Sequence, residues 1–349
     1  LTKLLASETR QRNAVRDELR ELVQEFATPR RSKVTRASDL VTIEDDVPEE
    51  TEPGLEEIGD QPTLVTLSTS GLLGRRSPNE EFTAKPGRHD VVARSLETSA
   101  FAVVSAVTDQ GRVLSVRARE IPEMVRGSRG ASVTEMFSLS RGERVVGLFG
   151  DGMDPIVLVT RNGTAKRVEV DVLKRLRSGS SAIKLKGDDR VASAFVTSED
   201  SEIVMVASDG QALRTPAQGI SLQGPGASGV AGMKLKPGAN VIASGVVEFG
   251  TAVVVISDEG AIKATDVAEI PSKGRATGGV KTVKWRDFET TAAFGWVGRS
   301  QQLAAVVADA SDDKKADSTP VPLVLELTRR DSMTSTLEGR ILLIGEYRL

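Results

Sequence analysis

The sequence predicts an all-β fold of six similar units that close into a propeller-like ring, preceded by a helix. A short phrase recurs along the chain: an apolar run, then Ser or Thr, two more residues and a Gly. Its glycines lie 40, 52, 47 and 50 residues apart, and a repeat of this period is typical of arrays and propellers. An apolar fraction of 39% is ample for a packed core, and no apolar run approaches the ~18 residues of a membrane span. The turn glycines are Gly71, Gly111, Gly163, Gly210 and Gly260.

The first 27 residues are expected to be helical. Val15, Leu19 and Leu22 lie on one apolar stripe, and Pro29 ends the pattern. Two interpretations stay open: a surface helix of this chain, or the end of a longer helical element. The chain begins with Leu and a charged stretch rather than a signal peptide, so we interpret it as a fragment of a longer protein.

An acidic segment separates this helical region, residues 1–31, from the repeats. Residues 1–61 carry 15 Asp/Glu against 9 Lys/Arg, and nine of these acids fall between Glu44 and Asp60. Together with its prolines, this composition predicts an exposed linker over 32–62. The strand pattern then occupies residues 63–349.

Each unit is expected to contribute about four short strands, the content of a propeller blade. The first run ends in the Gly turn, which supplies a positive φ, and a second run returns as a hairpin. A Gly-rich basic stretch and a closing apolar run follow. The sixth unit is irregular: its first strand is expected at 302–308, its return at 323–327, and a final strand at 340–345 that shuts the ring beside the first unit.

Basic residues recur after the turn glycines and in the Gly-rich stretches. If the units surround one axis, equivalent positions lie on a circle, and these cations form a charged rim that suits a bent polyanion. Few aromatics argue against stacking on single-stranded bases, so duplex DNA is the expected ligand. For any single cation a solvated surface role is the better interpretation; the recurrence favours the rim. The candidate residues are Arg75, Arg76, Lys85, Arg88, Arg112, Arg117, Arg126, Arg129, Lys166, Arg167, Lys174, Arg175, Arg177, Arg214, Lys234, Lys236, Lys263, Lys273 and Arg275.

Other functions find little support. There is no Cys, and His89 is the only His, so thiolate metal sites are excluded and a catalytic relay would have to use His89. The G-x-G-x-x-G at 224–229 contains Pro225 and precedes no convincing helix, so we do not interpret it as a nucleotide site. The acidic residues at 309–317 lack a calcium-loop pattern. A protein-interaction propeller would show a Trp-Asp pair in each blade, and neither Trp precedes Asp; it remains an alternative. We expect no catalytic residues, metal or cofactor in this chain.

Several phrases resemble a known family. The repeat, DQGRVLSVRAREIPE at 109–123, GASGVAGMKLKPGANVI at 226–242 and EFATPRRSKV at 25–34 are similar to the C-terminal region of the A subunit of bacterial type IIA topoisomerases, DNA gyrase and topoisomerase IV. The resemblance implies a six-bladed β-pinwheel, a ring whose blades exchange strands, with duplex DNA bent around its basic rim. It also implies that residues 1–31 are the end of a helix from the topoisomerase core.

The same resemblance implies partners and conditions for the parent enzyme: an A-subunit core, an ATPase B subunit in an A2B2 assembly, ATP and Mg, and a cytoplasmic, nucleoid-associated location, while this fragment alone is monomeric and non-catalytic. Gyrase A subunits carry a Q-R-R-G-G-[KR]-G box in the first blade. Here TAKPGRHDVV at 83–92 keeps only Lys85, Gly87 and Arg88. This departure favours topoisomerase IV, and a gyrase A subunit with a degenerate box remains the alternative.

Overall fold

The computed structural model describes residues 7–26, 60–78, 90–124, 130–257, 260–286, 291–308, 320–337 and 339–346. Contacts divide the chain into two units, Leu1–Glu57 and Ile58–Leu349. The described part of the first unit is helix α2, Glu8–Phe26, with Val15, Leu19 and Leu22 exposed. This confirms the predicted helix over the residues described. The predicted linker lies outside the described residues except for 60–62.

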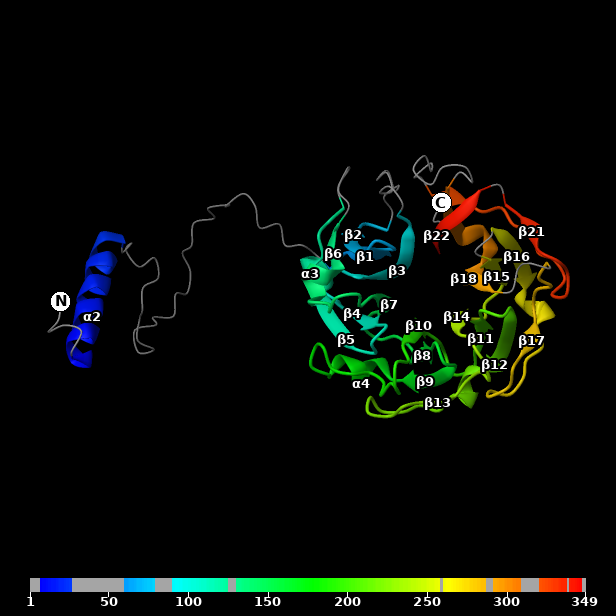
Figure 1. The fold of residues 1–349 in the computed structure, drawn as a ribbon, viewed down its shortest axis with the longest axis horizontal. Coiled ribbons are helices and arrows are strands. Elements are labelled where there is room, and N and C mark those ends of the chain that lie inside the picture. Colours follow the sequence, from blue (N-terminus) through cyan, green and yellow to red (C-terminus); the bar gives the residue numbers. More distant parts are fainter. Residues whose placement is uncertain are drawn as a thin grey trace, which may run out of the picture. The chain divides into compact units, whose positions relative to one another are not determined.

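The second unit is a ring of six three-stranded blades (Figure 1). In each blade the first strand pairs antiparallel with the second strand on one side and the third on the other, and the third strands lie nearest the axis. The blades are β1 Pro62–Ser68, β2 Leu72–Arg76 and β3 Val92–Ser99; β4 Val103–Thr108, β5 Val113–Arg117 and β7 Val145–Phe149; β8 Ile156–Thr160, β9 Thr164–Val168 and β10 Val191–Val196; β11 Glu202–Ala207, β12 Gln211–Pro216 and β14 Val241–Val246; β15 Thr251–Ser257, β16 Ala261–Asp266 and β18 Ala292–Arg299; β19 Leu303–Ala308, β20 Val321–Pro322 and β22 Arg340–Glu346.

The recurring phrase builds the hairpin turn of each of the first five blades. All five turn glycines have φ between 75° and 85°, a conformation that favours Gly. The side chain of the Ser or Thr three residues before the Gly accepts a hydrogen bond from the backbone N–H of the residue that follows the Gly. Thr160, for example, accepts from the Thr164 N–H at 3.1 Å. In blade 4 Ala207 occupies the Ser/Thr position, and the Asp209 carboxylate accepts a hydrogen bond from the Gln211 N–H instead. The repeat is therefore a turn motif, as predicted.

A fourth, exchanged strand completes most blades from the following unit. β6 (Ala131–Ser132), β13 (Val230–Ala231), β17 (Val280–Lys281) and β21 (Ser335–Thr336) pair with β2, β9, β12 and β16 respectively, at the outer edge of the ring (Figure 1). Blade 2 has the equivalent bridge between Arg112 and Ser181. A Cβ on Gly279, which precedes β17, would collide with the Ala212 carbonyl, so only Gly allows this approach. This exchange distinguishes a pinwheel from a simple propeller.

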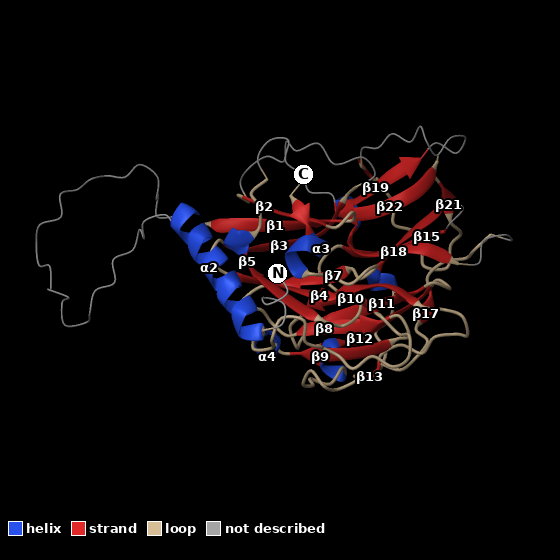
Figure 2. Ribbon diagram, turned by 60° about the vertical axis from the view of Figure 1, so that its left-hand side comes forward, coloured by secondary structure: helices blue, strands red, loops and turns tan. Residues whose placement is uncertain are grey.

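Within the described residues, five apolar clusters form the core, one between each pair of consecutive blades from 1 to 6. The cluster between blades 3 and 4, for example, joins Val157 and Val159 to Ile203, Met205 and Leu213. A view turned by 60° shows that strands dominate and that the helices of the ring, α3 Val133–Phe137 and α4 Val170–Lys174, are short (Figure 2). Burial between blades therefore holds the ring together.

The sixth blade differs from its predicted form. The return strand was expected at 323–327, but β20 is Val321–Pro322, and Leu327 instead bridges Ala264 of blade 5. The expectation was wrong because those residues follow the rule of units 2, 4 and 5, in which the segment after the hairpin runs beside the preceding blade. The predicted closure is confirmed: β22 meets β3 through Glu346 and Val92, and the Ser95 hydroxyl donates to the Glu346 carboxylate at 2.5 Å.

Candidate nucleic-acid interface

The cations on the second strand of each hairpin are mostly internal. Lys166, three residues after its turn glycine, is 0% exposed, and its ammonium donates to the carbonyls of Ala182, Pro225 and Ala227 at 2.7, 3.1 and 3.0 Å. Burial lowers its pKa to about 8. The last two acceptors belong to the Gly-rich loop of the next unit, the G-x-G-x-x-G sequence. Lys166 therefore fixes a loop in place and presents no charge to a ligand.

Lys263 occupies the same position in blade 5 and has the same role. It is 2% exposed and donates to Thr328 Oγ1, the Arg329 carbonyl and Ser332 Oγ at 2.8, 2.5 and 2.8 Å. Burial lowers its pKa as well. The three acceptors again come from the next unit.

The arginines one residue further along connect neighbouring blades. The Nε atoms of Arg75 and Arg167 donate to the carbonyls of Ile121 and Ile220 at 2.9 and 2.8 Å, and Arg214 Nη1 donates to the Val267 carbonyl at 3.3 Å. Each acceptor lies in the next unit. The in-register recurrence of these arginines is thus explained by assembly of the ring.

Several other half-buried candidates form ion pairs with carboxylates. Arg112 makes a bidentate pair with Glu143, whose side chain is fully buried, at 2.8 and 2.6 Å. Although burial alone would raise the pKa of Glu143, hydrogen bonds from Arg112, Thr108 and Ser140 lower it to about 2. Lys174 pairs with Asp151 at 2.5 Å, and Arg214 pairs with Glu202. Arg76 is half-buried on β2.

The exposed candidates belong chiefly to the Gly-rich stretches. Among them, Lys236 pairs with Asp209 at 3.0 Å, Lys273 donates to the Gly279 carbonyl, and Arg275 donates to the Ala231 carbonyl. Four further candidates, Lys85, Arg88, Arg126 and Arg129, lie outside the described residues. The exposed set is Arg117, Arg175, Arg177, Lys234, Lys236, Lys273 and Arg275.

Beside the predicted Lys234 and Lys236, the structure places equivalent cations that were not singled out from the sequence: Lys184, Lys186, Lys284 and Arg286. Lys184, Lys234 and Lys284 are exposed and lie 50 residues apart. Their backbone N–H groups donate to equivalent carbonyls of the next unit, those of Ala227, Thr277 and Ser332, at 3.2, 3.0 and 3.2 Å. Lys186, Lys236 and Arg286 repeat two residues later; the first two are exposed and Arg286 is half-buried. The signal was present in the sequence as the K-x-K pairs at 184–186 and 234–236.

These six residues, which we call the loop cations, form equivalent pairs in blades 3, 4 and 5. They lie in the segments between the exchanged outer strands and the inner strands. Such a repeated series of charges, five of the six exposed, attracts a polyanion. Within the described residues, no group of His, Cys, Asp and Glu could hold a metal ion, and no helix has the length and apolar character of a membrane span.

Comparison with known sequences identifies the family. The family described as "DNA gyrase C-terminal domain, beta-propeller" matches residues 104–149, 154–198, 201–248 and 252–288, half of the chain. The chain belongs to this family. The family inferred from the sequence is therefore confirmed.

A curated relative, the A subunit of DNA gyrase from Aminobacterium colombiense, is 32% identical over 235 residues, which cover 63% of this chain and 27% of the relative. The chain thus spans about a quarter of the length of that protein. Two solved structures share the fold: a C-terminal domain of DNA topoisomerase IV, with a TM-score of 0.70 and 21% identity over 83% of this chain and 94% of that one, and a DNA gyrase A C-terminal domain, with a TM-score of 0.60 and 19% identity over 82% and 100%. These likenesses confirm the predicted β-pinwheel.

Proposed function

We propose that the ring binds duplex DNA along its outer edge and bends it, as the C-terminal domain of a type II topoisomerase A subunit. The observation that carries this proposal is the recurrence of the loop cations at equivalent positions in three consecutive blades, five of the six being exposed. Lys and Arg neutralise phosphates and release counterions, which supplies affinity without sequence preference. The family match supports the assignment.

The proposed interface differs from the one that the sequence suggested. Lys166, Arg167 and Lys263 are buried and leave the set. Arg117, Arg175, Arg177, Lys234, Lys236, Lys273 and Arg275 stay in it, and the four other loop cations, Lys184, Lys186, Lys284 and Arg286, join it. Smoothly bending 20–30 bp by 40–90° costs roughly 1–6 kcal/mol, which about six to ten phosphate contacts offset.

The rest of the parent enzyme follows as part of the same proposal. The bent duplex would be presented to an A-subunit core that passes strands with an ATPase B subunit, in the bacterial cytoplasm, with ATP and Mg used outside this chain. The A2B2 assembly is likewise proposed from the family. The ring itself contributes DNA binding and no catalytic group.

The behaviour we propose is that of topoisomerase IV, bending without a tight chiral wrap. Its support is the incomplete box at 83–92, of which residues 83–89 lie outside the described part of the chain. The name of the curated relative favours the second candidate, a gyrase A subunit with a degenerate box. Closing a relaxed circular plasmid with ligase while the chain is bound separates the two. An unchanged linking number supports bending alone, and a strong shift supports the gyrase type.

Removing three loop lysines tests the interface directly. In the triple variant Lys184→Gln, Lys234→Gln, Lys284→Gln, we expect duplex affinity to fall by about tenfold or more, equally for unrelated sequences, and the slope of log K against log salt to fall by about 2.7, or 0.9 for each lost phosphate contact. Fluorescence anisotropy over a salt series measures both.

A control variant that removes the same number of positive charges separates the loss of the loop lysines from the change in net charge. Arg10→Gln, Arg16→Gln, Arg20→Gln on α2 removes three charges outside the ring. If both triple variants lost affinity equally, or if the loop variant bound DNA like the unmodified chain, the loop cations would not be the interface.

A further inference from the structure

A cavity of about 730 Å³ lies on the axis of the ring at the end that carries the hairpin turns. Residues of all six blades line it, from Leu67 in blade 1 to Ile344 in blade 6. A second cavity of about 260 Å³ continues it and shares Arg94, Ala192 and Ile242 with it. The larger cavity falls in the usual size range of small-molecule sites, roughly 300–1,000 Å³.

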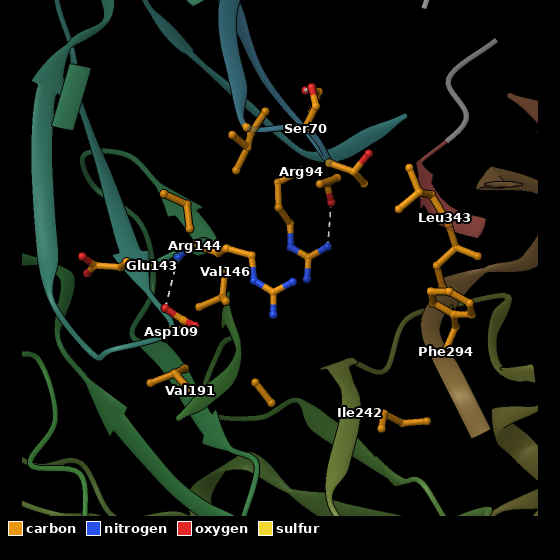
Figure 3. Close-up of a pocket in the computed structure, with 18 of the residues that line it drawn as sticks. Ser70, Arg94, Asp109, Glu143, Arg144, Val146, Val191, Ile242, Phe294 and Leu343 are labelled. Atoms are coloured by element: carbon orange, nitrogen blue, oxygen red, sulfur yellow. Dashed lines mark hydrogen bonds between the residues drawn. The ribbon is translucent and has the colours of Figure 1, made fainter. Parts of the chain in front are cut away.

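Three arginines give one side of this cavity a positive charge. Arg94 comes from β3, Arg144 immediately precedes β7, and Arg161 lies in the turn between β8 and β9. Figure 3 shows the side chains of Arg94 and Arg144 reaching into the cavity. Arg144 and Arg161 are exposed, and Arg94 is half-buried.

The acids in the lining do not cancel this charge. There are two, Asp109 and Glu143. Asp109 pairs with Arg190 at 3.2 Å, and Glu143 pairs with Arg112, so each acid is neutralised by an arginine outside the cavity lining. Asp109 also accepts from the backbone N–H of Arg144 at 3.1 Å (Figure 3).

Among the described residues, no carboxylate is in direct contact with these three guanidinium groups. Within the described residues, neither Arg94, Arg144 nor Arg161 forms an ion pair, and Arg94 Nη1 donates only to the Ala93 carbonyl, at 2.6 Å. Burial lowers the pKa of Arg94, and the charge of Glu346 in the second cavity raises it. An incoming anion would supply the counter-charge that Arg144 and Arg161 lack within the described residues.

The opposite side of the cavity is apolar. Ile242, Phe294 and Leu343 of blades 4, 5 and 6 face the arginines across it (Figure 3). A cationic wall opposite an apolar wall restricts an anion to one side and leaves the other free for an uncharged group.

We propose that this axial cavity binds a small molecule that carries several phosphate groups, held by Arg94, Arg144 and Arg161. Guanidinium groups suit this ligand because each offers paired N–H donors to two phosphate oxygens. None of the loop cations lines either cavity, so the site does not depend on the proposed DNA interface.

Isothermal titration of the 349-residue chain without divalent cations tests this site. The probes are inorganic tripolyphosphate and ATP. We expect saturable binding that weakens by about tenfold or more in Arg144→Gln and in Arg161→Gln, since each removes a charge-assisted hydrogen-bonding group. These exposed side chains have no partner within the described residues, and thermal unfolding will show whether the variants fold normally. ATP binding tighter than tripolyphosphate identifies a nucleotide that also uses the apolar wall; equal affinity identifies a free oligophosphate.

The matched control is Arg175→Gln, an exposed arginine at the end of α4 with the same charge change. We expect it to leave the affinity for both probes unchanged while it weakens DNA binding, and Arg144→Gln to do the opposite. Absence of saturable binding by either probe, or equal weakening in Arg175→Gln and Arg144→Gln, would overturn the proposal.

Discussion

Lys166 and Lys234 were assigned to the same charged rim by the sequence, yet the structure gives them opposite environments. Lys166 is sealed inside the ring on three carbonyl oxygens, whereas Lys234 is exposed and hydrogen bonds through its backbone alone. The difference lies in their partners. A cation on the second strand of a hairpin meets the loop of the next unit, while a cation on that loop meets solvent.

This comparison separates two causes of an in-register repeat. Charges recur on the hairpin strands of several blades because they hold the exchanged segments there. They also recur on the loops of blades 3, 4 and 5, where five of the six loop cations are exposed. Leu114 and Leu213 make the point for the first group. They occupy the position of Lys166 in blades 2 and 4 and are buried. Because either Leu or Lys fills this buried position, its role is to pack the blade against the next unit.

The largest effect should come from Lys166→Met. The change keeps the apolar length but leaves three buried carbonyls without their ammonium donor, so we expect the free energy of unfolding to fall by about 3–5 kcal/mol. Urea unfolding measures it. Lys234→Met, at an exposed position, should change stability by less than about 0.5 kcal/mol. Equal stability of the two variants would remove the distinction between the groups.

A somewhat smaller effect is expected at low pH, where protonation of Glu143 lowers the free energy of unfolding. The pKa of Glu143 is about 2 in the folded chain, against 4.5 ordinarily, so between these values the unfolded chain binds more protons. The resulting stabilisation, about 3 kcal/mol at 1.36 kcal/mol per pKa unit, is complete above pH 4.5 and is lost as the pH falls toward 2. Urea unfolding at a series of pH values should show this loss, which Glu143→Gln abolishes and Glu199→Gln, at an exposed acid, retains. An unaltered pH profile in Glu143→Gln would contradict the assignment.

The smallest effect is expected at Arg75, which shares features of the buried hairpin-strand cations and of the exposed cations. Arg75 is 23% exposed and combines a hydrogen bond to the Ile121 carbonyl with a 3.4 Å pair to the exposed Glu123. Arg75→Gln should lower the free energy of unfolding by about 1 kcal/mol. Arg117→Gln, fully at the surface, should lower it by less. Thermal melts would resolve the order, and a larger loss from Arg117→Gln would show that exposure does not separate the groups.

Much of the fold was predictable because the repeat is a local motif. Each turn needs a Gly at positive φ and a nearby acceptor oxygen, and both requirements are visible within a few residues, as at Thr160 and Gly163. The closure of the ring was also predictable, since a final apolar run remained without a partner. The return strand of blade 6 was misplaced because an insert precedes it and its neighbour in blade 5 is distant in sequence.

The site was less predictable because burial depends on contacts between units. Nothing near Lys166 in the sequence announces that Pro225 and Ala227, about 60 residues later, will accept its hydrogen bonds. Lys234 and Lys236 were among the predicted residues, and Lys184 and Lys284 could have been added because each lies 50 residues from Lys234. The axial arginines could not, since Arg94, Arg144 and Arg161 occupy different positions in their units and converge only when the ring closes.

Because the outer strand of blades 1, 3, 4 and 5 and the outer bridge of blade 2 come from the unit that follows, these blades are completed in one direction along the chain. A nascent chain leaving the ribosome would keep an open sheet edge on its newest blade until the next unit had been synthesised. Truncation between units would likewise damage the blade before the cut, so deletion from the C-terminal end removes one blade and uncovers another.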